Sequence, residues 1–137
     1  MAVNKTGAEK AIASAEREFR SAMASLKEKD YAGALKYLQE CSEYAVKAVL
    51  LAYGVDYPKT HTVGRFLYEM REKYPQWFAK QIKSIADVAD DLARSRARFR
   101  YPYEHPSEQY EVMVGHVFPR VKKALEDCRS FIQRFFG

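Results

Sequence analysis

The sequence predicts an all-α protein, a five-helix antiparallel bundle of the up-and-down type. Apolar residues recur at steps of three and four along nearly the whole chain, and no strand-like alternation persists. The 6 glycines and 5 prolines cluster at a few points, which predicts short connections between helices. An apolar content of 47%, with 14% aromatic residues, argues against a disordered chain.

Two apolar stripes define the first two helices. Thr6 and Glu9 have capping-box spacing, so we expect the first helix to begin near Thr6 and to end around residues 27–29. Asp30 is the expected N-cap of the second helix, and Gly54 should end it. The stripes comprise Ile12, Ala15, Phe19, Met23 and Leu26 in the first helix, and Ala34, Leu35, Leu38, Cys41, Ala45, Val49 and Ala52 in the second.

A loop over residues 55–61 leads to a short third helix, which should end before Pro75. The fourth helix has the clearest stripe of the chain, and we expect it to run on to Arg100. Arg96 occupies a position of this stripe where an apolar side chain is expected. Because a charge on a buried face must be paired or reach a cleft, Arg96 is a candidate binding residue. The stripe comprises Phe78, Ile82, Ile85, Ala89, Leu92, Arg96 and Phe99.

The last helix contains a proline. Ser107 is its expected cap, and its stripe continues to Phe135. Pro119 lies inside this stripe, and it lacks the N–H that a helix interior needs. We therefore expect the helix to be kinked or broken near Val117 and Phe118.

Composition narrows the class of protein. The net charge of +5, from 23 basic and 18 acidic residues, is compatible with an anionic partner but is far from a polybasic tail. No apolar run approaches membrane-spanning length, and the N-terminus lacks the apolar stretch of a signal peptide, so we expect a cytoplasmic protein with no membrane association. Cys41 and Cys128 fall within helical stripes and should be buried free thiols.

The segment from Arg100 to His105 joins the fourth helix to the last one. Pro102 disfavours the α region for Tyr101, and Pro106 keeps the chain from winding up again at once, so His105 lies on a short loop that can fold back towards Arg100. A guanidinium beside a side chain that titrates near neutrality suits phosphate chemistry. A helix-terminal arginine and a solvated loop histidine account for the same residues without any function, and the segment alone leaves both interpretations open.

Four landmarks follow one another along the chain. They are the second-helix segment from Gln39 to Leu50, the turn Gly54…Pro58-Lys59-Thr60-His61, the long helix that ends in Arg100-Tyr101-Pro102, and the motif Arg100–x4–His105. Together they resemble the HEPN family (higher eukaryote and prokaryote nucleotide-binding domain), whose second helix carries a Gln…Glu…Ala-x-Lys-Ala pattern. Each landmark alone is weak, but their order and spacing are specific and span nearly the whole chain. The resemblance implies a single helical domain over residues 1–137.

The resemblance also implies a function. Many family members are dimeric, metal-independent endoribonucleases whose two Arg–His motifs meet in one interfacial cleft, and several are toxins paired with a nucleotidyltransferase antitoxin. Others bind only nucleotides or partner proteins, so a non-catalytic module that works with a nucleotidyltransferase is the alternative. In the toxin branch a tyrosine two residues after the motif histidine is the antitoxin's target. Ser107 stands there, so that modification is not carried over.

Metal-free RNA cleavage needs a base for the 2′-hydroxyl, an acid for the leaving oxygen and positive charge on the phosphorane. By the resemblance, His105 of one copy is the base and His105 of the second copy the acid, while each Arg100 holds non-bridging oxygens. No cofactor is implied. The histidines are spread over three elements and the carboxylates lack ligand spacing, so no metal site is expected.

Four further residues complete the predicted site. Glu43 and Lys47 form an i,i+4 pair, which is either a solvated ion pair or, because the family's second helix faces the cleft, a means to orient the catalytic pair. Arg96 lies one turn before Arg100 and can point to the same place. Tyr103 can stack on a base. We thus predict Glu43 as a catalytic residue and Arg96, Lys47 and Tyr103 as substrate-binding residues.

Overall fold

The computed structural model describes residues 3–57, 59 and 62–137, and the side chains of these except Arg100 and Pro102. Every regular element in these ranges is a helix, as predicted. The helices are α1 (Lys5–Lys27), α2 (Tyr31–Ala52), α3 (Val63–Glu69), α4 (Gln76–Arg94), α5 (Arg96–Arg100) and α6 (Ser107–Phe136), with single 3₁₀ turns η1 (Arg71–Lys73) and η2 (Pro102–Glu104).

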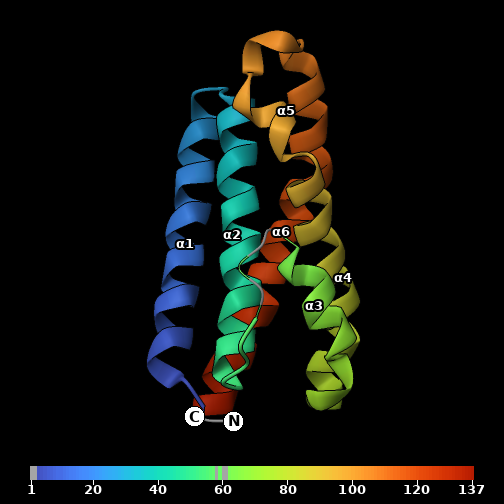
Figure 1. Cartoon of the computed structure of the whole chain (residues 1–137). Helices are drawn as coiled ribbons and strands as arrows, with labels where there is room; N and C mark the ends of the chain where they lie inside the picture. Colours follow the sequence, from blue (N-terminus) through green and yellow to red (C-terminus); the bar gives the residue numbers. More distant parts are fainter. Residues whose placement is uncertain (1–2, 58, 60–61) are drawn as a thin grey trace.

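Four long helices, α1, α2, α4 and α6, lie side by side and alternate in direction (Figure 1). Helix α2 is the central one, since it packs against α1, α4 and α6. Helix α3 lies against the side of α4, while α5 and η2 cover the end of the bundle where α1 turns into α2 (Figure 1). None of the helices in the described part of the chain is long and apolar enough to cross a membrane.

The first connections show how local side chains end and begin helices. Asp30 caps α2 as predicted, because its carboxylate accepts the backbone N–H of Gly33 at 2.9 Å. The start of α1 differs from the prediction: Asn4, not Thr6, is the cap, and its side chain accepts the N–H of Gly7 at 2.9 Å. Gly54 follows α2 with a φ of 68°, a left-handed conformation that glycine adopts without strain.

The predicted long fourth helix is interrupted at Ser95, which separates α4 from α5. The N–H of Ser95 is shared between the carbonyls of Asp91 and Leu92, at 3.2 Å each, and the N–H of Arg98 then bonds to the Ser95 carbonyl at 3.0 Å. Bonds of this shorter span tighten the turn and change the direction in which the following residues point. Phe99, four residues beyond Ser95, is fully buried, as its place on the stripe predicted.

Of the kink or break predicted near Pro119, a break does not occur, because α6 continues from Ser107 to Phe136 with Pro119 inside it. Both Pro119 and Gly115, whose carbonyl would have accepted the missing N–H, are exposed. That carbonyl can bond to water instead, so the lost bond falls where it is least costly. Ser107 is the first residue of α6 and not its cap, since Pro106 occupies the N-cap position.

The core agrees with the stripes in most positions. Ala22 is buried at the end of the first stripe, whereas the predicted Met23 is 39% exposed. Cys41 and Cys128 are buried free thiols, as predicted. An aromatic cluster closes the end of the core that lies furthest from α5, and it includes Tyr74, whose hydroxyl donates to the Val49 carbonyl at 3.0 Å.

Candidate functional site

The Arg100–x4–His105 motif lies where α5, η2 and the start of α6 follow one another, at one end of the bundle (Figure 1). Arg100 is the last residue of α5, and its side chain lies outside the described part of the structure. His105 is exposed on extended backbone, with φ −135° and ψ 150°. This conformation follows from Pro106, which disfavours the helical region for the residue before it.

Two buried aromatic side chains attach this segment to the bundle. Phe99 of α5 is buried in the core. Tyr110, only 4% exposed, donates its hydroxyl to the backbone carbonyl of Arg98 at 2.8 Å. Tyr110 belongs to α6, so this bond joins the helices on both sides of the loop. The ring of His105 lies edge-on to the ring of Tyr110, with centroids 6.1 Å apart. Our sequence analysis gave Tyr110 no functional role, although it follows His105 by only five positions.

Glu43 lies inside the bundle, where it is 7% exposed. One carboxylate oxygen accepts from Nε2 of Gln39 and the other from Nζ of Lys47, each at 3.1 Å. The ion pair with Lys47 is present, but the interpretation of it as solvated is wrong because its carboxylate is buried. Sequence reasoning also missed the part played by Gln39, although it precedes Glu43 by four positions and so occupies the same helix face.

Lys47 is held by more than its carboxylate partner. Its Nζ lies 5.9 Å from the ring centroid of Tyr44 and 5.9 Å from that of Tyr57, and its side chain is 22% exposed. Such cation–π contacts help to hold the ammonium group in place. Gln39, Glu43 and Lys47 thus form a connected row of polar groups along α2.

The sequence predicted that Arg96 would be paired or would reach a cleft. Arg96 does line a cleft. A hollow of about 320 Å³ lies between α1, α2 and α5, and Arg96 and Phe99 line it from α5. Gln39 lines the same hollow from α2. Arg96 therefore lines the same hollow as Gln39, whose amide donates to Glu43.

Tyr103 lies apart from this buried group. It is 81% exposed on η2, and its ring meets the ring of Tyr101 edge-on with centroids 6.1 Å apart.

The other two histidines lie outside the Arg100–His105 motif. His116 is exposed and belongs to α6. His61, with Pro58 and Thr60 of the same turn, lies outside the described residues. The described residues contain no group of three or more histidine, cysteine, aspartate and glutamate side chains that could hold a metal ion.

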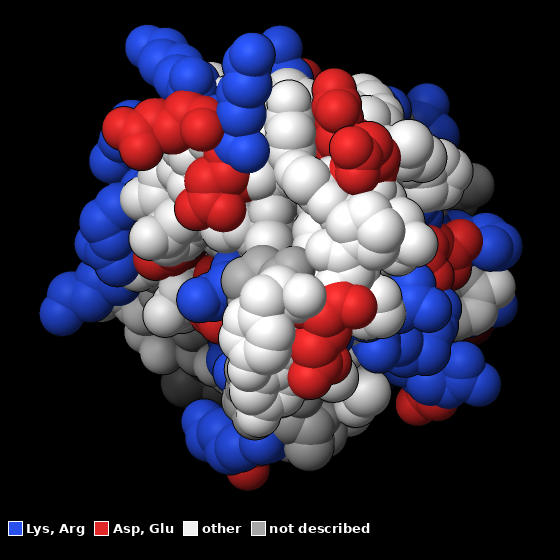
Figure 2. All heavy atoms as spheres, turned by 90° about the horizontal axis from the view of Figure 1, so that it is seen from above, with Lys and Arg blue, Asp and Glu red and all other residues white. Residues whose placement is uncertain are grey.

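The end of the bundle that carries the motif has no single sign of charge. Figure 2 shows mostly uncharged residues in the middle of this end, with basic and acidic side chains in mixed groups around them.

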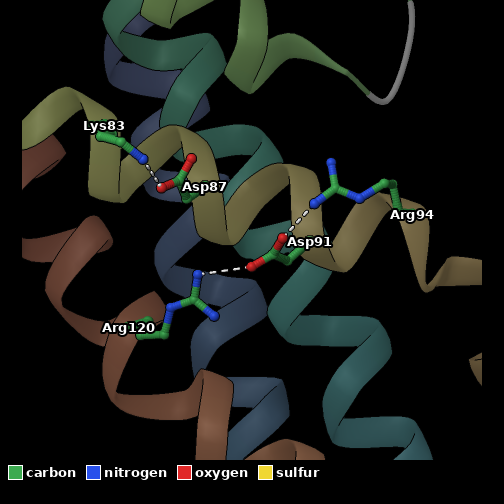
Figure 3. A network of polar contacts seen from close by, with 5 residues as sticks. All are labelled: Lys83, Asp87, Asp91, Arg94 and Arg120. Atoms are coloured by element: carbon green, nitrogen blue, oxygen red, sulfur yellow. Dashed lines mark hydrogen bonds and ion pairs between the residues drawn. The ribbon is translucent and has the colours of Figure 1, made fainter.

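Some basic side chains of α4 and α6 form ion pairs with aspartates of α4. Asp91 pairs with Arg94 and also with Arg120 of α6, at 2.9 Å, while Lys83 pairs with Asp87 at 2.7 Å (Figure 3). The Asp91 network ties α4 to α6.

A comparison with protein-family models matches the chain to the HEPN domain over residues 8–135. The chain belongs to the HEPN domain family. The resemblance inferred from the four landmarks is thereby confirmed, and the matched range includes the Arg100–x4–His105 motif. No curated protein and no solved structure matched this HEPN chain.

Proposed function

We propose that this HEPN protein is a metal-independent endoribonuclease that works as a homodimer. The observation that supports this most is the position of the motif. His105 is exposed on extended backbone at the end of the bundle, in a segment that Phe99 and Tyr110 attach firmly to the core. A general base must be both accessible to the substrate and held in place.

In this mechanism the imidazole of His105 takes the proton of the ribose 2′-hydroxyl, and the 2′-oxygen attacks the adjacent phosphorus. His105 of the second copy gives a proton to the 5′-oxygen as the P–O bond breaks, which leaves a cyclic phosphate and a 5′-hydroxyl. Each Arg100 guanidinium holds non-bridging oxygens, where negative charge grows in the transition state.

Glu43 has a positioning role in this proposal, because a side chain that is 7% exposed is poorly placed to touch RNA. It accepts hydrogen bonds from Gln39 and Lys47, and Gln39 lines the hollow that Arg96 also lines. Arg96 supplies positive charge one turn before Arg100, Lys47 supplies it further along α2, and Tyr103 supplies an exposed ring on which a base can stack.

The test is to incubate purified protein with total RNA in excess EDTA and to identify the new ends. We expect wild type to produce cyclic-phosphate ends, and Arg100→Ala and His105→Ala to produce none. Arg98→Ala and His116→Ala are matched controls, because each removes an exposed side chain of the same type from outside the motif. Circular dichroism and the mass in solution should show that every variant remains a folded dimer.

The proposal fails if His105→Ala cuts RNA as fast as wild type does. A wild-type mass corresponding to a monomer under conditions that support cleavage would contradict the composite site. Cleavage that EDTA abolishes would contradict its metal independence.

The mixed charge of the motif end favours a second candidate, since proteins that bind RNA through its backbone usually present a basic patch (Figure 2). On this alternative the domain binds a nucleotide, or a nucleotidyltransferase antitoxin, without cutting RNA. Calorimetry would then show heat of nucleotide binding that Arg100→Ala weakens, with intact RNA in the cleavage assay. The paired system would also be supported if the adjacent gene encoded a small nucleotidyltransferase.

A further inference from the structure

The hollow between α1, α2 and α5 has the size of a small-ligand site. Its volume of about 320 Å³ is at the lower end of the roughly 300–1,000 Å³ typical of such sites. Phe99 and Tyr37 are its aromatic lining residues, and the 39% exposed Tyr37 is the one that is open to a ligand. There is room for one flat ring system, but not for several nucleotides at once.

The polar lining contains both signs of charge. Glu18 and Glu40 offer carboxylates, which only accept hydrogen bonds, while Lys36 and Arg96 offer cations, which only donate them. The amide N–H of Gln39 is directed to Glu43, so its carbonyl oxygen is the part of that amide left to accept. Two carboxylates disfavour a simple anion, and five polar side chains disfavour an apolar ligand. The lining suits a flat ligand whose edge carries both donors and acceptors.

We propose that this hollow binds a guanine base of the RNA substrate, an inference that rests on the proposed function for its substrate class. Guanine offers two adjacent donors, N1–H and the N2 amino group, which one carboxylate can accept together. Its O6 and N7 are acceptors that suit an arginine or lysine. Uracil has a single N–H, and the Watson–Crick edges of cytosine and adenine lack a second donor beside the amino group. The Tyr37 ring supplies the stacking surface.

The position of the hollow connects it to the motif. Arg96 precedes Arg100 by four residues on the same helix, which corresponds to about 6 Å along the helix axis. A base held beside Arg96 therefore belongs to a nucleotide close to the phosphate that Arg100 would hold. This geometry predicts that the preferred cleavage sites have guanine at a fixed distance from the cut.

The binding test uses guanosine 5′-monophosphate against cytidine 5′-monophosphate in calorimetry, and it needs no catalytic activity. We expect the guanine nucleotide to bind at least roughly tenfold more tightly, in keeping with the discrimination that one good base contact gives. Glu40→Gln, or Glu18→Gln if that carboxylate is the acceptor, should remove this preference, and Tyr37→Ala should weaken both ligands. Glu126→Gln is the matched control, because it removes the same charge from an exposed position on α6.

The cleavage test maps the bases around each cut made by wild type and by the two glutamate variants. A guanine preference that one of these variants loses, while Glu126→Gln keeps it, supports the inference. Equal affinity for the two nucleotides, or a preference unchanged in both glutamate variants, overturns the inference and leaves the ribonuclease proposal intact. Selective guanine binding without RNA cleavage by wild type supports the site and counts against the ribonuclease proposal.

Discussion

Glu43 shows how a single buried carboxylate is made stable inside a helical bundle. Burial of an isolated carboxylate is costly, and Gln39 and Lys47 offset that cost by donating to its two oxygens. Both donors come from the same helix as Glu43, four positions before it and four positions after it. These two contacts therefore follow from the spacing of residues along α2.

Removal of this carboxylate should destabilise the protein. Glu43→Ala leaves the amide of Gln39 and the partly buried ammonium of Lys47 without their acceptor, so we expect a loss of about 1–3 kcal/mol in the free energy of unfolding. Urea denaturation followed by circular dichroism measures it. Asp87→Ala is the comparison, because Asp87 belongs to an exposed i,i+4 pair whose loss should matter much less. Equal losses in the two variants would show that burial adds nothing to the Glu43 contacts.

The Glu43–Lys47 pair was predicted from its spacing, but its burial was not. Spacing places two side chains on one helix face, whereas burial depends on which helices cover that face. Helix α2 is covered by α1, α4 and α6, so even its polar face is enclosed, as the buried Gln39 and Ser42 show. The loop position of His105 was predicted, because two prolines beside it restrict the backbone whatever the surroundings.

At the scale of elements, the contact between α3 and α4 depends on a missing side chain. A Cβ added at Gly64 would lie 2.7 Å from the carbonyl oxygen of Ala86 and 2.7 Å from a carboxylate oxygen of Asp90. That oxygen of Asp90 is buried without a hydrogen-bond partner. Burial raises the pKa of Asp90, and a hydrogen bond from the Arg65 backbone partly offsets the effect. This is a close approach of helix backbones that only glycine permits.

Two alanine substitutions should therefore have opposite effects. Gly64→Ala should destabilise by about 1–3 kcal/mol, because α3 must move away from the Ala86 carbonyl. Gly115→Ala should stabilise by roughly 0.5–1 kcal/mol, since a Cβ there meets nothing within 4 Å and alanine favours the helix. Thermal and urea unfolding of both variants measure the difference. A Gly64→Ala protein as stable as wild type would mean that α3 is free to shift away from α4.

Helix interiors were predicted well and helix interruptions poorly. The apolar stripe from Phe78 to Phe99 continues with little change of step across Ser95, so periodicity gave no sign of the turn that separates α4 from α5. Pro119 was expected to kink or break the last helix, and α6 is not broken there. Its cost depends on whether the Gly115 carbonyl can reach water, and that exposure is decided by the packing of α6 against the other helices.

At the scale of the whole molecule, the buried acids of the core should make the fold sensitive to alkali. Burial raises the pKa of the Cys41 thiol from 9.0 to about 12, and it also raises the pKa values of Cys128, Tyr53 and Tyr74. The unfolded chain loses its thiol protons above about pH 9, whereas the folded chain keeps them. Because the unfolded state then binds fewer protons, stability should fall as pH rises from about 9 towards 12.

Urea midpoints measured between pH 8 and pH 11 test this prediction, and we expect them to decrease steadily above pH 9. An independent measurement is thiol labelling at pH 8, where neither cysteine should react until the chain is unfolded. A constant midpoint up to pH 11, or rapid labelling of the folded protein, would contradict the burial of these groups.

The length of α6 also determines where anything joined to this chain can lie. Its 30 residues span about 45 Å, from the loop of His105 to the end at which Phe136 meets Lys5 of the first helix. A fusion partner, an affinity tag or a surface tether attached at either end of the chain would therefore start far from the Arg100–His105 segment (Figure 1). Immobilisation through either end should leave the motif open to the solution, which makes the protein suited to capture experiments with long RNA.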